Sequence, residues 1–243
     1  MATRSKIEWT EHTWNPVTGC TKVSPGCKHC YAEVLANRLK AMGTPGYENA
    51  FKLSVHPVRL DVPVMRKKPT IYFVNSMSDL FHEKIQFSYI DSVLDVIRTT
   101  PRHRYQILTK RPEIMASYFA TRHVPENAWL GTSAENRKHG LPRIDILRRI
   151  DANIRFLSIE PLLEDLGTFD LSGMNWVIVG GESGPKARPM KAAWARSIQR
   201  QCQAMNVPFF FKQWGSFGDD GVRRAKANNG RALDGRTWDQ LPA

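Results

Sequence analysis

Short, continuous apolar runs recur along the chain, and a segment with helical spacing of its apolar residues follows most of them. Runs without polar alternation are typical of strands buried on both faces, as parallel strands are. Since parallel strands are joined by right-handed crossovers, the alternation predicts an α/β fold, a full or partial (β/α) barrel of parallel strands, with a flat doubly wound sheet as the alternative. We expect strands over Thr70–Asn75, Arg104–Thr109, Ala128–Thr132, Ile154–Ile159, Trp176–Gly180 and Pro208–Lys212, after a short strand ahead of Cys20.

The segments between these strands have the spacing of amphipathic helices. In the last of them Ile198, Cys202 and Met205 share one helix face, so we predict that Cys202 is a core residue and not a ligand. The expected helices are Tyr31–Met42, Phe87–Arg98, Pro112–Tyr118, Pro142–Ile150 and Lys191–Met205.

The length of 243 residues suits one α/β domain. We expect that domain over residues 1–215 and, from the polar, basic composition that follows, a C-terminal tail or hairpin over residues 216–243. Gly43–Lys68 has no clear period and is predicted to be an insertion or long loop. Neither a signal-peptide pattern nor a run of about 18 apolar residues occurs, so we expect a cytoplasmic protein without membrane association.

The chain is basic, with 35 Lys and Arg against 23 Asp and Glu, a net charge of +12. Such a surface attracts polyanions over long range, which favours a nucleic acid or nucleotide as partner. The same charge also keeps a protein soluble, so composition leaves both interpretations open.

Three of the four cysteines, Cys20, Cys27 and Cys30, fall within eleven residues. Disulfide frameworks favour small secreted domains with dispersed partners, so this grouping indicates a metal-ligand set. Cubane 4Fe–4S clusters usually take four cysteines, and a set of three leaves one iron open to a substrate or cofactor. The alternative is a closed structural zinc site, in which a histidine completes the set. The histidines considered for that role are His12, His29 and His56.

The run WNPVTGCTKVSPGCKHCYAE, Trp14 to Glu33, resembles the signature of an uncharacterised phage- and bacteria-associated family grouped with the radical S-adenosylmethionine enzymes. The blocks FVNSMSDLFHE, LTKRPE, WLGTSAEN, SIEPLL, VGGESG and FFKQWG extend the resemblance over most of the chain. The loop reads C-x6-C-x2-C where the commonest radical-enzyme loop reads C-x3-C-x2-C. His29 and Tyr31 flank the third cysteine, and the loop is distantly similar to that of the spore photoproduct lyase branch.

The resemblance implies a 4Fe–4S cluster on the three cysteines and S-adenosylmethionine beside it, with His29 and Tyr31 near the cofactor. It further implies an electron donor such as flavodoxin or ferredoxin and a 5′-deoxyadenosyl radical that abstracts hydrogen from the substrate. Together with the basic charge, it indicates modification or repair of a nucleic acid base or nucleotide.

Catalytic groups of barrel enzymes sit at the carboxyl ends of the strands, where this chain is rich in polar residues. The resemblance places the first such edge beside the amino group of S-adenosylmethionine, although an Asx-type turn explains the same residues. That edge comprises Asn75, Ser76, Ser78 and Asp79. At the next strand end, Lys110 and Arg111 can hold a cofactor carboxylate or a substrate phosphate, with Lys110 our catalytic candidate, unless they are simply solvated.

The later strand ends supply the remaining candidates. Ser133 and Glu135 suit ribose hydroxyls, although Ser133 also suits a helix N-cap. Glu160, held before Pro161, and Glu182 are expected to be catalytic. Backbone at Gly180 and Gly181 can approach a ligand closely. The last strand ends in Gln213 and Trp214, which can bind a purine, although packing equally explains Trp214.

Two other functional classes fit parts of the same pattern. A non-enzymatic, zinc- or cluster-stabilised nucleic-acid-binding protein would use the same cysteines and charge. A hydrolase or transferase would use Glu160 and Glu182 as acid and base, with structural cysteines.

Overall fold

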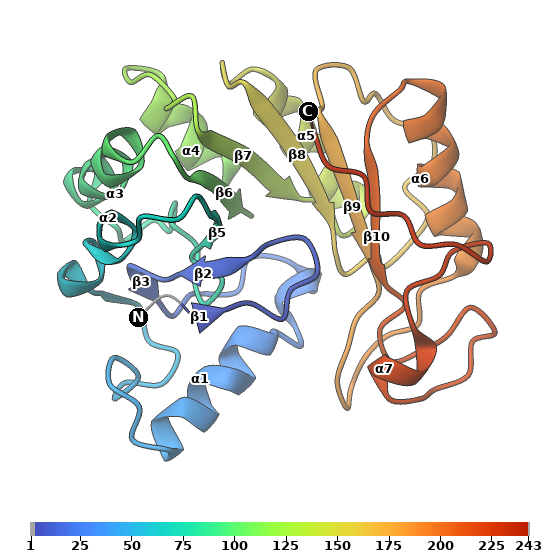
Figure 1. Cartoon of the computed structure of the whole chain (residues 1–243). Helices are drawn as coiled ribbons and strands as arrows, with labels where there is room; N and C mark the ends of the chain where they lie inside the picture. The colour runs from blue at the N-terminus through green and yellow to red at the C-terminus, as the bar shows by residue number, and fades with distance from the viewer. Residues whose placement is uncertain (1–2, 243) are drawn as a thin grey trace. The chain divides into compact units, whose positions relative to one another are not determined.

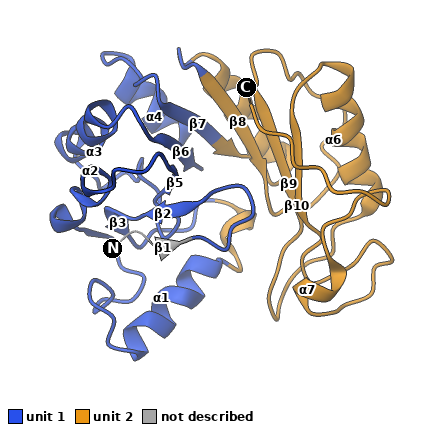
Figure 2. Ribbon diagram, in the orientation of Figure 1, with its two compact units in different colours: residues 1–23, 30–131, 150–153 blue, residues 24–29, 132–149, 154–243 orange. Residues whose placement is uncertain are grey.

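The computed structural model describes residues 3–242, with side chains from residue 5 onward, and the chain divides into two compact units. Unit 1 comprises the chain up to Val23, then Cys30–Gly131 and Ile150–Asn153. Unit 2 comprises Ser24–His29, Thr132–Arg149 and the chain from Ile154 on (Figure 2). The segment that carries Cys27 therefore groups with the C-terminal half of the chain.

Unit 1 is built on parallel strands. Its strands follow the order β1 (Thr3–Arg4), β2 (His12–Trp14), β5 (Ile71–Val74), β6 (Arg104–Thr109) and the start of β7 (Ala128–Ser133). β1 pairs with β2 in antiparallel fashion, whereas β2, β5 and β6 are parallel (Figure 1). A separate antiparallel pair joins β3 (Val17–Thr18) to β4 (Ser54–Val55).

The helices of unit 1 bury one apolar face each. In α3 (Phe87–Thr99) the buried residues Ile90, Val93, Leu94 and Ile97 recur at helical spacing. The other helical segments are α1 (Tyr31–Ala41), η2 (Pro57–Arg59), α2 (Val62–Met65) and α4 (Pro112–Phe119). The predicted loop Gly43–Lys68 thus contains β4, η2 and α2, three short elements.

Unit 2 is also built on parallel strands. The end of β7 is followed by β8 (Ile154–Ile159), β9 (Trp176–Gly180) and β10 (Phe209–Gln213), in spatial order. All five residues of β9 are buried, as a central parallel strand requires. The helical segments are η1 (Pro25–Cys27), α5 (Arg137–Arg148), α6 (Ala192–Ala204), which packs on β9 and β10, and α7 (Lys226–Asn229).

The expected α/β class with a partial barrel of parallel strands is confirmed, and every predicted strand occurs. One helix boundary was wrong. α5 begins at Arg137 and not at Pro142, which lies inside the helix. The Asn136 side chain caps the helix by accepting a hydrogen bond from the backbone N–H of His139 at 3.0 Å. An asparagine before a helical run is the signal that locates this start.

Cys202 lies on α6 and is fully buried. Burial raises the pKa of its thiol to about 12, so it stays protonated and supplies no thiolate. Its prediction as a core residue is confirmed.

The chain after Gly215 is held by local pairing in unit 2. Phe217 bridges Arg223, and Leu233 bridges Arg236. Arginines in this segment pair with nearby aspartates, as Arg224 does with Asp220. The boundary between residues 215 and 216 stays a prediction. None of the helices described for residues 3–242 combines the length and apolar character needed to cross a membrane.

Candidate active site

In unit 1 the predicted site residues collect where β5 and β6 end. Asp79 is 5% exposed, and its carboxylate accepts hydrogen bonds from the Thr109 hydroxyl at 2.7 Å and the Lys110 backbone N–H at 3.1 Å. It also accepts from the Phe81 N–H at 3.0 Å and from Arg111 Nη1 at 3.1 Å. Both carboxylate oxygens are therefore engaged within the protein, and they fix the position of Arg111.

Arg111 is buried and distributes its donors over four neighbours. Nε donates to Glu83 at 2.8 Å, Nη2 donates to the Thr21 hydroxyl at 2.8 Å, and Nη1 donates to the sulfur of Cys20 at 3.5 Å in addition to Asp79. Burial disfavours the charged guanidinium, but the opposing charges of Asp79 and Cys20 outweigh it and raise the pKa of Arg111. Arg111 is a fixed cation that is hydrogen-bonded to the cysteine loop, not a solvated side chain.

A second buried ring supports the same loop. His82 Nδ1 accepts from the Lys84 N–H at 3.1 Å, which assigns the proton to Nε2 and makes Nε2 the donor to the Thr21 hydroxyl at 2.9 Å. Burial and the Arg111 charge lower the pKa of His82, so the ring is neutral. Sequence analysis did not single out Thr21 or His82.

The other predicted residues at the end of β5 brace the neighbouring backbone. Asn75 adopts a φ of 58° that ends the strand, and its Oδ1 accepts from the Val17 N–H at 3.1 Å. The Ser78 hydroxyl donates to the Val17 carbonyl at 2.8 Å, and the Tyr31 hydroxyl donates to the Ser76 carbonyl at 2.5 Å. Within the described residues, the buried Asn75 Nδ2 has no hydrogen-bond partner, so this edge retains one donor for a ligand.

The three loop cysteines form no disulfide and are of intermediate exposure. Cys20 and Cys30 belong to unit 1, where Cys30 is the N-cap residue of α1, and Cys27 belongs to unit 2. The side chains described, from residue 5 to residue 242, include no group of three His, Cys, Asp or Glu assembled for a metal ion. By chemistry and accessibility the three thiols fit an iron–sulfur cluster as a donor set, because none is consumed by a disulfide.

Three histidines, His12, His29 and His56, are the candidates to complete a zinc site. His56 Nε2 shares a 2.8 Å hydrogen bond with the Thr18 hydroxyl, and burial lowers the pKa of the ring. His12 lies within β2, in register with Tyr72. His29 belongs to unit 2 with Cys27.

In unit 2, Glu160 and Lys212 meet at the carboxyl ends of β8 and β10. Lys212 Nζ lies 2.7 and 2.8 Å from the two carboxylate oxygens, and both side chains are largely buried. Gln213 Nε2 donates to Glu160 at 3.2 Å and to the Gly181 carbonyl at 3.3 Å. Its Oε1 is buried and unpartnered within the described chain. The site thus combines an ion pair with one unused amide acceptor.

Glu182 and the segment around Cys27 are tied together in the same unit. Arg188, which sequence analysis missed, donates to Glu182 through its backbone N–H, Nε and Nη2 at 2.7–2.8 Å. Nη2 also donates to the Pro25 carbonyl at 3.0 Å. Burial opposes ionisation of Glu182, but these bonds hold the pKa of its carboxyl below the usual range. Glu182 is therefore ionised and positions the loop residue Pro25.

Glu135 is fully buried and pairs with Arg143 of α5 at 2.8 Å. The same guanidinium donates to the Ser133 carbonyl at 3.2 Å. An ideal Cβ on Gly26 would lie 3.0 Å from the Glu135 carboxyl group, so glycine lets the Cys27 segment pack against it. Asn136, and not Ser133, caps α5.

Trp214 is packed in the interior of unit 2. It is 3% exposed, contacts Phe211 edge-on and donates through Nε1 to the Ala232 carbonyl at 2.7 Å. A Cβ on Gly181 would lie 1.9 Å from the Trp214 carbonyl oxygen, so Gly181 is required by this packing. Neither ring face is open to a base.

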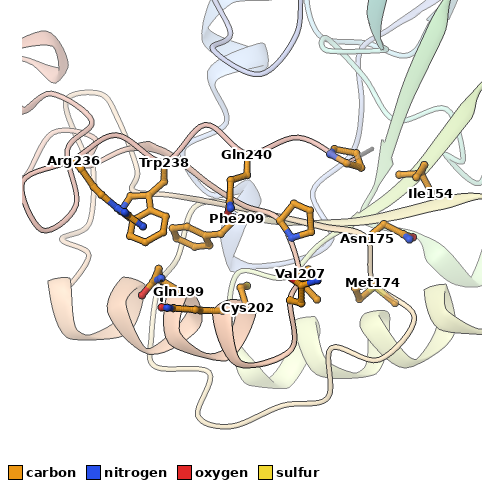
Figure 3. Close-up of a pocket in the computed structure, with 14 residues that line it drawn as sticks. Ile154, Met174, Asn175, Gln199, Cys202, Val207, Phe209, Arg236, Trp238 and Gln240 are labelled. Atoms are coloured by element: carbon orange, nitrogen blue, oxygen red, sulfur yellow. Dashed lines mark hydrogen bonds between the residues drawn. The ribbon is translucent and has the colours of Figure 1, made fainter.

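A pocket of about 560 Å³ lies at the opposite, amino ends of β8 and β10 (Figure 3). Cys202 and Phe209 line it, and Arg236 lies over the Trp238 ring at 3.5 Å. None of the predicted site residues contributes to its wall.

Residues 4–242 match the family described as "Protein of unknown function (DUF5131)". The chain belongs to this family. No curated protein matches this DUF5131 chain. Among solved structures it is similar to a spore photoproduct lyase complexed with dinucleoside spore photoproduct, at 14% identity and a TM-score of 0.50. It is equally similar to a mutant of that enzyme with bound AdoMet and dinucleoside spore photoproduct, at 14% identity and a TM-score of 0.50.

A further mutant of the lyase matches at 16% identity and a TM-score of 0.50. Each match covers 83% of the DUF5131 chain and 63% of the solved chain, so the chain spans less than two thirds of the lyase. At these identities the likeness establishes the fold, an α/β partial barrel of the type found in the lyase.

Proposed function

We propose that this protein is a radical S-adenosylmethionine enzyme whose 4Fe–4S cluster is held by Cys20, Cys27 and Cys30. One observation carries the proposal: three partly exposed cysteines that form no disulfide occupy one short loop of a fold that is similar to a lyase solved with bound AdoMet. A set of three thiolates leaves an open iron position for a cofactor. When bound, the cluster and S-adenosylmethionine together would supply a 5′-deoxyadenosyl radical.

The chain's own residues would bind and orient the cofactor and substrate. Asn75 Nδ2, a buried donor without a partner in the described chain, suits the cofactor carboxylate better than its amino group. Gln213 Oε1 is a buried acceptor that also has no hydrogen-bond partner in the described chain, and it suits an amino group such as that of adenine. Glu160, held in place by Lys212, is our candidate to hold or move a proton of the substrate.

For the substrate we propose a nucleic acid base or nucleotide. The net charge of +12 favours phosphate-bearing partners, and the similar lyase was solved with a dinucleoside photoproduct. A cytoplasmic location and an electron donor such as flavodoxin or ferredoxin complete the proposal.

The test is anaerobic purification with analysis of iron, sulfide and zinc, then reduction with S-adenosylmethionine and assay for 5′-deoxyadenosine. About four irons per chain and formation of 5′-deoxyadenosine are expected. Substitution of any of Cys20, Cys27 and Cys30 by Ala should abolish both. One zinc per chain with no cofactor cleavage would contradict the proposal.

The basic charge alone supports a second candidate, a zinc- or cluster-stabilised nucleic-acid-binding protein without catalysis. That candidate predicts oligonucleotide binding that is independent of S-adenosylmethionine and reductant. Binding that persists in protein without cofactor cleavage would favour it over the enzyme.

A further inference from the structure

We propose that Arg111 is a positioning residue that holds the Cys20 thiolate and raises the reduction potential of the cluster. The inference rests on the proposed function. It starts from the 3.5 Å contact between Arg111 Nη1 and Cys20 Sγ, made by a residue that is 6% exposed. Hydrogen bonds to cysteine sulfur and nearby charge are among the factors that set iron–sulfur potentials.

The geometry assigns this role to Arg111 and excludes a direct role with substrate. Its three nitrogens are all directed to groups of the protein, and none is left for a phosphate. Two of its bonds reach Thr21, the residue next to Cys20, through the carbonyl at 3.1 Å and the hydroxyl at 2.8 Å. Arg111 therefore fixes the backbone and the sulfur of the first ligand at once.

Two carboxylates hold the guanidinium in this orientation. Asp79 lies 3.1 Å from Nη1, the nitrogen that also donates to the sulfur, and Glu83 lies 2.8 Å from Nε. His82 donates a hydrogen bond to the Thr21 hydroxyl and, being neutral, adds no charge beside Arg111. A planar fork with several fixed donors is what arginine provides and lysine does not.

An added electron makes a thiolate-bound cluster more negative, so a fixed cation and an N–H donor stabilise the reduced form. Loss of the Arg111 contact should lower the reduction potential while leaving the three ligands in place. Iron content should then be unchanged, and the ratio of reduced to oxidised cluster at a fixed poise should fall about tenfold, a shift of about 59 mV for a one-electron couple.

The experiment compares reconstituted wild type with Arg111→Gln and Arg111→Lys by redox titration followed by EPR, together with iron analysis. Arg111→Lys keeps the charge but lacks the planar fork of donors. Its reduction potential should lie between those of wild type and Arg111→Gln. Because Arg111→Gln leaves Asp79 buried without its cation, the double variant D79N/R111Q, measured against D79N, replaces the single variant if that variant unfolds. Arg122→Gln is the matched control, since Arg122 pairs with Asp91 in unit 1.

A lower potential in Arg111→Gln or in the double variant, with full iron content and an unchanged Arg122→Gln control, supports the inference. Equal potentials in all variants overturn it while leaving the radical-enzyme proposal intact. If wild type takes up no iron–sulfur cluster, the proposed function fails, and the inference fails with it.

Discussion

Glu182 accepts three hydrogen bonds from Arg188, and the same guanidinium donates to the carbonyl of Pro25, two residues before Cys27. A carboxylate at the end of β9 thereby holds one segment of the cysteine loop. The arrangement works only while Glu182 is ionised, which its low pKa ensures.

Stability should therefore depend on pH through Glu182. Because the pKa of Glu182 is lower in the folded than in the unfolded chain, its contribution is complete above about pH 4.3 and is lost as pH falls through the folded value. Glu182→Gln should lower the free energy of unfolding by about 1–3 kcal/mol at pH 7. Denaturant titrations at several pH values should show a flatter acid profile for the variant. Parallel profiles would contradict the assignment.

Cys202→Ala should retain the full metal content of wild type. The thiol is buried and protonated, so its loss leaves a small cavity and costs about 1 kcal/mol of unfolding free energy. Metal analysis and thermal unfolding measure the two effects separately. Loss of metal in Cys202→Ala would contradict the prediction that Cys202 is a core residue and not a metal ligand.

Glu160→Gln should abolish turnover of substrate but preserve cluster assembly and cofactor cleavage. The amide keeps the shape of the side chain but carries no charge to pair with Lys212 and accepts no proton. Product and 5′-deoxyadenosine are measured in the same reaction. Glu164→Gln is the control, because Glu164 instead accepts from the Arg137 backbone N–H. Turnover that survives Glu160→Gln would exclude a catalytic role.

Trp214→Ala should lower the free energy of unfolding by about 3–5 kcal/mol, since the buried indole leaves a cavity. Trp194→Ala should cost less, because Trp194 is only half-buried. Chemical denaturation measures both variants. A Trp214→Ala protein of normal stability that had lost nucleotide affinity would restore the base-binding role.

Lys110→Ala should weaken oligonucleotide binding and reduce the slope of log K against log salt by about 1 if Lys110 contacts a phosphate. Arg111 is not expected to contact a phosphate, because its donors are engaged within the protein. Lys67→Ala, at an exposed position ahead of β5, is the control. An unchanged slope in Lys110→Ala would place Lys110 outside the interface.

The strands could be predicted from the sequence because a strand buried on both faces must be apolar at every position. The observed bounds of β6 and β8 equal the predicted ones, Arg104–Thr109 and Ile154–Ile159. The start of α5 was missed because Pro142 resembles a first-turn proline, whereas Asn136 provides the cap. The spacing of the three loop cysteines is likewise a property of the sequence alone.

The tertiary structure decided which polar groups at the strand ends remain available. Asp79 and Glu182 were predicted as ligand-binding or catalytic groups, yet each is engaged by an arginine, Arg111 or Arg188. A buried charge requires a partner, and the partner is chosen by how segments far apart in sequence meet, as Asp79 and Arg111 do across 32 residues. Sequence therefore determined the strands and the spacing of the loop cysteines, and folding determined which side chains hold the loop and which keep an unpartnered polar atom.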